Sequence, residues 1–154
     1  MLSKKTDKSK DSGRLADGPD TPVQLASDGM YFGILRTDKP LRIDGEFTGV
    51  AFCDNKVYLG KNSKFSGDLI CRDAVIEGVV DGNVMCSNKL WLHQNGVIEG
   101  NARVTLFENQ EGAQILNGVF IDPKLKQEDI KDIFEKRCAN IDFKKIQADV
   151  FAVK

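Results

Sequence analysis

Apolar and polar residues alternate in short runs through the middle of the chain, and glycines interrupt these runs at regular intervals. Five glycines, spaced by 18, 15, 18 and 18 residues, each follow an apolar–polar pair: Phe47-Thr48-Gly49, Phe65-Ser66-Gly67, Val80-Asp81-Gly82, Ile98-Glu99-Gly100 and Leu116-Asn117-Gly118. The residue two places after each glycine is also apolar: Ala51, Leu69, Val84, Ala102 and Phe120. A second series, spaced by 18, 18 and 16 residues, consists of Gly60, Gly78, Gly96 and Gly112. A repeat near 18 residues is typical of a solenoid, in which each repeat forms one turn.

The alternation within each repeat predicts short β-strands with one buried face, and the glycines mark corners where a side chain would be unwelcome. We therefore expect an all-β fold, a parallel β-helix of about five coils. About 18 residues per coil leave room for three short faces, and five coils about 4.8 Å apart make a rod about 24 Å long. Each end of such a rod exposes unpaired N–H and C=O groups, which must be capped or paired with another molecule.

The composition divides the chain into three segments. Residues 1 to about 30 are rich in Lys, Asp, Ser and Gly and hold few large apolar residues, so we expect residues 1–34 to form a disordered N-terminal tail. Residues 35–121 are rich in Val, Ile, Leu, Phe and Gly, and no proline lies between residues 41 and 122, as a hydrogen-bonded ladder requires. Residues 122–154 form a third segment with a helical pattern.

The third segment predicts a short C-terminal helix. Asp122 is a suitable N-cap, and Pro123 suits the first helical turn. The apolar positions recur at helical spacing: Leu125, Ile130, Ile133 and Phe134. Residues 141–151 form a second, weaker amphipathic pattern. The helix could lie across the last coil and cap it, or it could bind a partner, and the sequence leaves both alternatives open.

Charge and apolar content exclude several classes of partner. The chain of 154 residues carries 22 Lys and Arg against 23 Asp and Glu, so it has no basic excess to hold a nucleic acid. No apolar run approaches the roughly 18 residues of a membrane-spanning helix. The start of the chain lacks the apolar core of a signal peptide, and the four cysteines form no CxxC pair. We therefore expect the protein to lie in the cytoplasm, where its thiols stay reduced.

The cysteines and the single histidine are the candidates for chemistry. Cys53, Cys71 and Cys86 each lie four residues after a repeat glycine, and Val104 continues the series, so we interpret them as a stacked column of small buried residues. Such a column does not converge tetrahedrally on a metal, and we expect no metal and no cofactor. Glycine-rich stretches lack the Lys and Ser/Thr pair of a phosphate loop, so we expect no bound nucleotide. His93 is expected at the surface.

The order and spacing of four segments, IDGEFTG, LGKNSKFSGDL, VIEGVVDGNV and GVIEGNARV, resemble the bactofilin domain over residues 35–121. The resemblance implies a right-handed, three-sided β-helix that polymerises end to end into non-polar filaments, as a scaffold for proteins of cell shape or cell-wall synthesis. It therefore implies a structural protein and no enzyme. The alternative is a hexapeptide-repeat acyltransferase, also a β-solenoid, in which His93 would act as a general base. The sequence lacks the sustained six-residue repeat of that class.

Two sets of residues are candidates for assembly and attachment. Large apolar residues near the boundaries of the predicted β-helix would form the polymerisation interface: Ile43, Phe47, Leu116, Phe120 and Ile121. The start of the chain resembles the membrane-targeting element of the family, in which apolar residues precede lysines: Met1, Leu2, Lys4 and Lys5. Such a tail would bind the inner membrane's cytoplasmic face weakly, at about 1 kcal/mol per basic residue. The alternative is a solvated tail without a partner.

Overall fold

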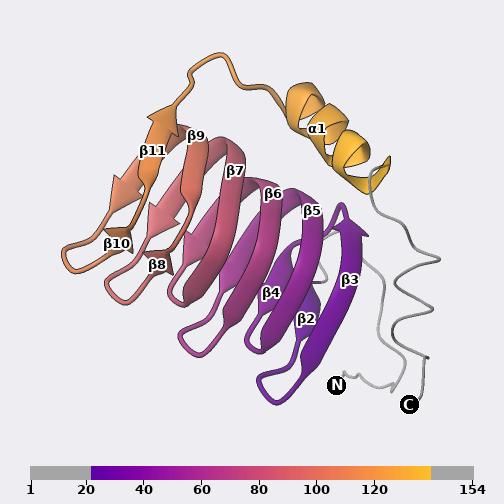
Figure 1. Cartoon of the computed structure of the whole chain (residues 1–154), viewed down its shortest axis with the longest axis vertical. Coiled ribbons are helices and arrows are strands. Elements are labelled where there is room, and N and C mark those ends of the chain that lie inside the picture. The colour runs from indigo at the N-terminus through magenta and orange to yellow at the C-terminus, as the bar shows by residue number, and fades with distance from the viewer. Residues whose placement is uncertain (1–21, 140–154) are drawn as a thin grey trace, which may run out of the picture.

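The structure is a computed structural model that describes residues 22–139. It is a parallel β-solenoid of about 6 turns with one short helix packed beside it (Figure 1). The strands form one ten-stranded sheet in which every pairing is parallel. The strands are β2 Val23–Leu25, β3 Met30–Thr37, β4 Leu41–Ile43, β5 Glu46–Leu59, β6 Lys64–Ile76, β7 Val79–Leu92, β8 Val97–Ile98, β9 Asn101–Asn109, β10 Gln114–Ile115 and β11 Gly118–Ile121, and the helix is α1 Gln127–Ala139.

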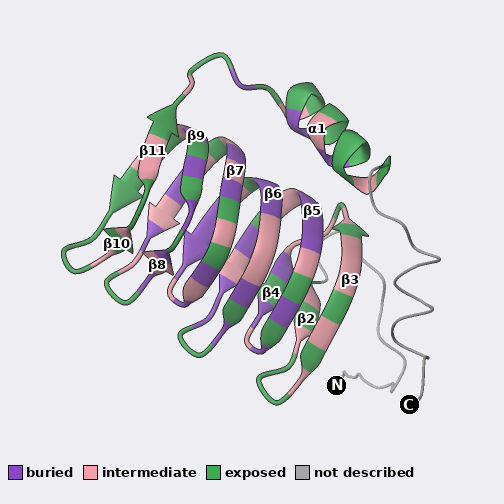
Figure 2. Cartoon of the chain, viewed as in Figure 1, coloured by how far each residue is buried: buried purple, intermediate pink, exposed green. Residues whose placement is uncertain are grey.

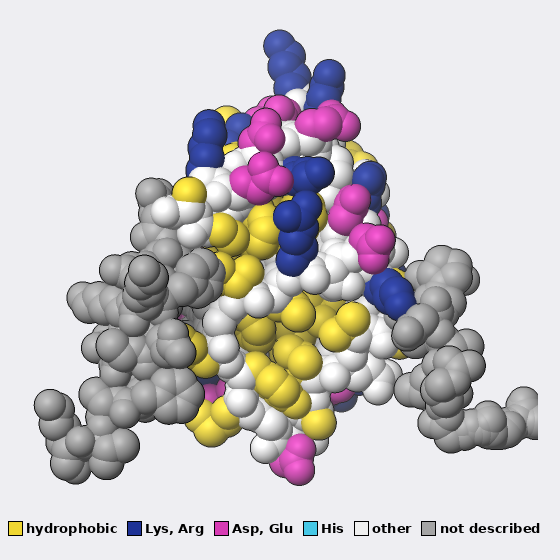
Figure 3. Space-filling view, turned by 90° about the vertical axis from the view of Figure 1, so that its right-hand side faces the viewer, with side chains coloured by type: hydrophobic (Ala, Val, Ile, Leu, Met, Phe, Trp, Pro, Cys, Tyr) yellow, Lys and Arg dark blue, Asp and Glu magenta, His cyan; other side chains and the backbone are white. Residues whose placement is uncertain are grey.

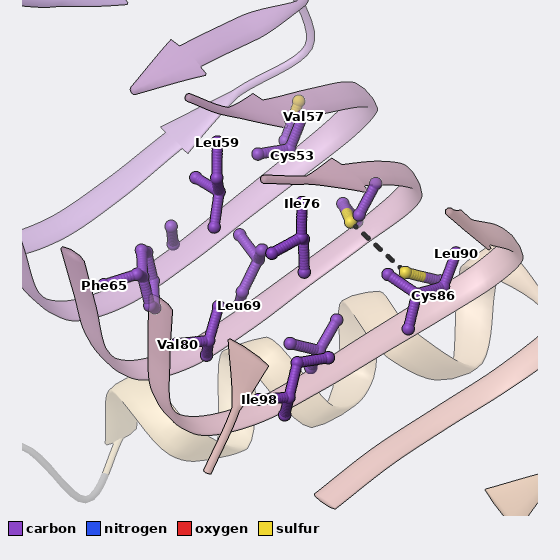
Figure 4. Packing of buried hydrophobic residues seen from close by; sticks show 14 of the residues in the cluster. Cys53, Val57, Leu59, Phe65, Leu69, Ile76, Val80, Cys86, Leu90 and Ile98 are labelled. Carbon is purple, nitrogen blue, oxygen red and sulfur yellow. Dashed lines mark hydrogen bonds between the residues drawn. The ribbon is translucent and has the colours of Figure 1, made fainter. Parts of the chain in front are cut away.

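The interior of the solenoid is filled by alternate residues of each strand. The largest buried cluster takes its members from every turn, and Phe47 and Phe65 stack inside it with ring centroids 5.1 Å apart. Figure 4 shows how side chains from successive turns fill the space between the strands. The register confirms the predicted column, because Cys53 pairs with Cys71 and Cys71 with Cys86. Val104 continues the column beside Cys86.

Glycines of the first series, together with Gly33 of the turn before them, form a column at one corner of the solenoid. Gly33, Gly49, Gly67 and Gly82 lie in register on successive turns and all have positive φ angles. A Cβ at Gly67 would lie 1.9 Å from the carbonyl oxygen of Gly49. The strands therefore bend at this corner with their backbones too close together for any side chain. This close approach explains why the repeat is most visible in the sequence at its glycines.

The solenoid begins at Val23 and not near residue 35. Strands β2 and β3 add a turn in front of the five that the repeat predicts. In this turn Tyr31 and Leu35 lie in register with Phe47 and Ala51, so their side chains continue the interior pattern. The predicted boundary at residue 35 rests on the polar composition of the chain up to about residue 30, and it leaves this turn in the tail. Residues 1–21 lie outside the described residues.

The last turn is shifted by one residue relative to the glycine alignment. Ile115, not Leu116, pairs with Ile98, and Gly118 pairs with Asn101. A Cβ at Gly118 would meet nothing within 4 Å, so this glycine does not belong to the corner column. Because side chains alternate with period two, a shift of one residue exchanges inward and outward positions. Val119 therefore faces the interior beside Ala102, and Leu116 and Phe120 are exposed.

Helix α1 begins at Gln127, later than the predicted cap. The backbone N–H of Asp122 donates to the Val104 carbonyl oxygen at 2.7 Å, which keeps Asp122 on the stack of turns. Its carboxylate accepts a hydrogen bond from the N–H of Lys124 at 3.0 Å, so Asp122 and Pro123 belong to a turn before the helix. The helix start is stabilised instead by the Asp129 carboxylate, which accepts from the N–H of Lys126 at 3.2 Å.

Helix α1 packs along the side of the solenoid and does not lie across its last turn. It contacts β5, β6 and β7, and together they form a second apolar cluster on the outer surface of the sheet. Phe134 stacks on Phe52 with ring centroids 5.0 Å apart, and Ile130 is fully buried. The guanidinium of Arg137 pairs with the Asp68 carboxylate at 2.7 Å. Buried residues line the face of α1 that meets the sheet (Figure 2). The alternative in which the helix caps the last turn is therefore wrong.

Candidate functional site

The two ends of the solenoid are the places where its backbone hydrogen bonding stops. Among the described residues, β2 and β3 in the first turn each pair with strands on one side only. The same holds for β10 and β11 in the last turn. Each end therefore presents a row of N–H and C=O groups able to pair with a further strand. In the stack itself these groups are paired from turn to turn.

Large apolar side chains are exposed at the last turn. Within residues 22–139, Leu106, Leu116, Phe120 and Ile121 are each more than half exposed. Leu106 and Phe120 occupy outward positions, where the preceding turn carries Lys89 and Arg103. The rule that outward positions are polar is thus broken at this end. The predicted interface residues Leu116, Phe120 and Ile121 all lie on this surface, which we name the last-turn surface.

The first turn carries a comparable surface. Met30 and Phe32 are 80% and 65% exposed, at outward positions where the next turn has Glu46 and Thr48. Side chains that close the interior at this end are only partly buried: Val23, Leu25, Tyr31 and Leu35. Figure 3 views the end that carries β3, and hydrophobic side chains gather at its centre inside a frame of backbone. We name these six residues the first-turn surface.

Two of the predicted interface residues lie elsewhere. Ile43 is fully buried and Phe47 is 4% exposed, because the first turn covers both of them. A sequence boundary at residue 35 omits that turn and so places both residues at an end. The sequence does hold a signal for the turn, since Tyr31, Gly33 and Leu35 repeat the pattern of Phe47, Gly49 and Ala51. Sequence reasoning also missed Met30, Phe32 and Leu106.

The six large hydrophobic residues that are exposed between residues 22 and 139 share one property. All of them lie in the first or the last turn: Met30, Phe32, Leu106, Leu116, Phe120 and Ile121. A soluble surface tolerates single exposed apolar residues, whereas several together mark a surface that contacts another molecule. On one face of the middle turns, the outward apolar residues Val50, Phe52 and Ile70 are instead covered by α1.

The cysteine column is an apolar part of the core. The Sγ atoms of Cys71 and Cys86 lie 3.7 Å apart, and both side chains are fully buried. Burial raises the pKa of Cys53 to about 12 and raises the pKa of Cys71 well above its usual value, so the thiols stay protonated. A metal would require thiolates. Within the part of the chain that the structure describes, no three His, Cys, Asp or Glu residues are grouped for a metal.

His93 lies on the outer surface in a hydrogen-bonded group. Its Nδ1 atom is 3.2 Å from Oε2 of Glu77, and about a third of its side chain is exposed. The hydroxyl of Tyr58 donates to the other carboxylate oxygen of Glu77. This hydrogen bond lowers the pKa of Glu77 and raises the pKa of Tyr58. Trp91 and Val75 border the shallow depression beside these residues.

The candidate membrane-targeting residues Met1, Leu2, Lys4 and Lys5 lie outside the described residues. The second amphipathic pattern, residues 141–151, also lies outside them. In the described segment, no helix is both long enough and apolar enough to cross a membrane.

Comparison with models of protein families gives one finding that covers the solenoid. Residues 24–119 match the bactofilin family, which is described as polymer-forming cytoskeletal. The match runs from β2 to β11 and includes more than half of the chain. No curated protein and no solved structure matches the chain.

Proposed function

This chain belongs to the bactofilin family of polymer-forming cytoskeletal proteins, and we propose that it forms filaments by contact between the ends of its solenoid. The observation that carries the proposal is the confinement of exposed large hydrophobic residues to the first and last turns. A subunit with two such surfaces takes two neighbours, and repetition of that contact gives a filament. The middle turns remain the sides of the filament, with α1 packed on one of them.

Two kinds of interaction support this contact. Docking removes the apolar side chains of Leu116, Phe120 and Ile121 from water. This burial stabilises the contact by about 25 cal/mol per Å² of apolar area. Strand edges that are open in the monomer gain backbone partners when another sheet adds to them. Ile43 and Phe47 support the contact from inside, by packing under the turn that forms the first-turn surface. Neither interaction needs a nucleotide, so we propose assembly without one.

We further propose that the filament attaches to the inner membrane and acts as a scaffold for proteins of cell shape or cell-wall synthesis. Met1 and Leu2 with Lys4 and Lys5 would bind an anionic membrane surface weakly in one subunit. A filament carries many such tails, so binding of one tail raises the effective concentration of the next. Assembly and membrane attachment therefore reinforce each other. We assign no catalytic role to His93, whose ring is held by Glu77 on the outer surface.

The first experiment is negative-stain electron microscopy of the full chain with light scattering, without added nucleotide or metal. Filaments a few nanometres wide are the expected result. Uniform small trimers would contradict the proposal, because a compact closed oligomer leaves no surface for further growth. Repetition with anionic lipid vesicles, and with Leu2→Ser and Lys4→Ser as variants of the tail, tests the membrane part separately.

A further inference from the structure

Helix α1 carries the chain back from the last turn to the first turn. At its start, the Ser87 hydroxyl donates to Oε1 of Gln127, which places this end beside β7. At its other end, Cys138 packs against the cluster that includes Ile34 of the first turn. The Arg36 guanidinium of the first turn lies 5.8 Å from the centroid of the Phe134 ring. Figure 1 shows α1 running along the turns toward the side of β3. The chain therefore leaves α1 next to the first turn.

The chain continues for fifteen residues after Ala139, and their composition is unlike that of a solvated tail. Residues 140–154 contain six large apolar residues within that short length, with Ala148 and Ala152 between them: Ile141, Phe143, Ile146, Val150, Phe151 and Val153. Fifteen residues reach about 22 Å as a helix and about 50 Å when extended. The eight residues of β3 span about 26 Å across two sides of a turn. The segment is thus long enough to cross the end of the solenoid.

The first turn, beside which α1 ends, carries an apolar surface that is left open. Met30 and Phe32 are exposed, and the interior behind Val23 and Leu25 is only partly covered. The other terminal segment, residues 1–21, also adjoins this turn through Val23. Its large apolar residues are few, namely Met1, Leu2 and Leu15, so it has less apolar surface to offer.

We propose that residues 140–154 dock on the first-turn surface of their own subunit and compete there with a neighbouring subunit. The proposal rests on the proposed end-to-end assembly and adds a regulated end to it. The last-turn surface stays open in the monomer, whereas the first-turn surface opens only when the segment leaves. The apparent affinity of that end for a neighbour equals the affinity of an open end multiplied by the fraction of subunits that are open. A segment docked nine-tenths of the time weakens the contact about tenfold where one first-turn surface enters it, and about a hundredfold where two first-turn surfaces meet.

The first test measures the critical concentration by sedimentation for the full chain and two variants of the segment. The triple variant Phe143→Ser, Ile146→Ser and Val150→Ser removes apolar contacts and is expected to lower the critical concentration by about tenfold or more. A matched control changes charged residues of the same segment: Lys144→Ser, Lys145→Ser and Asp149→Ser. The control is expected to behave like the full chain. Equal critical concentrations for the full chain and the apolar variant would overturn the proposal.

The second test does not depend on assembly. Cysteines are introduced as Met30→Cys and Ile146→Cys in a Cys138→Ser background, and a short bismaleimide is added to dilute protein. An intramolecular crosslink is expected. Crosslinks only between subunits would overturn the proposal. Capture of the segment by anionic vesicles, with the thiol introduced by Met30→Cys fully reactive in their presence, would overturn it as well.

The two tests separate the docking from the assembly on which it acts. If the crosslink forms while no variant makes filaments, the docking stands and end-to-end assembly fails. If filaments form without the crosslink and without a change in critical concentration, assembly stands and the docking fails.

Discussion

The substitution Phe120→Arg tests the last-turn surface most directly. Phe120 faces outward and is 63% exposed, so it lies outside the buried core of its own subunit. Burying a whole Phe side chain contributes about 1.5–3 kcal/mol, of which about 1–2 kcal/mol remains to be gained on docking. An arginine there loses this gain and adds a charge that must be removed from water beside Arg103, at a cost of several kcal/mol. Together these effects exceed about 3 kcal/mol per contact, or about a hundredfold in affinity.

The assay is sedimentation and electron microscopy over a range of protein concentrations. Phe120→Arg is expected to remain as β-rich monomers or dimers at concentrations about a hundred times those at which the full chain forms filaments. Asp81→Arg is the control, because Asp81 is an exposed residue of a middle turn and its replacement changes the net charge even more. Circular dichroism checks that both variants fold. Filament formation by folded Phe120→Arg at the concentration of the full chain would refute the role of this surface.

Four further predictions concern the solenoid and the helix packed on it. Gly67→Ala is expected to destabilise the fold by about 2–5 kcal/mol in chemical denaturation, because strain at its positive φ adds to a backbone clash; Gly33→Ala, with nothing within 4 Å of the new Cβ, should cost less. Phe134→Ala is expected to speed hydrogen exchange of the α1 amides about a hundredfold while the turns keep their protection. Because the pKa of Cys53 is raised to about 12 in the folded state, stability that is complete below about pH 9 should fall as pH rises toward 12. At pH 8 an alkylating reagent should label Cys138 in the folded monomer and leave Cys53 unreacted; labelling of both at equal rates would contradict the core placement.

The middle of the fold could be predicted from the sequence because it is a local repeat. Gly49 and Gly67 mark a corner where stacked backbones exclude a Cβ, and Phe47 and Phe65 occupy the same interior position one turn apart. The cysteine column follows from the same register. The family resemblance was also visible in the order of these segments, and the family match over residues 24–119 confirms it.

The ends of the fold could not be placed in this way. Gly118 keeps the spacing of the repeat, yet the last turn is shifted by one residue, which turns Leu116 and Phe120 outward. The first turn was missed because the polar tail before it set the predicted boundary, although Tyr31, Gly33 and Leu35 continue the repeat. Both outcomes depend on hydrogen bonds between turns, which the order of residues within one turn does not report.

The position of α1 also depended on the tertiary structure. Its apolar stripe predicted a partner surface, and either the last turn or another protein could have supplied it. The partner is the outer face of the middle turns, where Val50, Phe52 and Ile70 occupy outward positions that a solvated solenoid would fill with polar residues. The sequence by itself determined the repeat, the buried face and the helix, because each follows from spacing along a few consecutive residues. Only the tertiary structure decided the register of the last turn, the extra first turn and the docking of α1, because these depend on contacts between residues far apart in the chain.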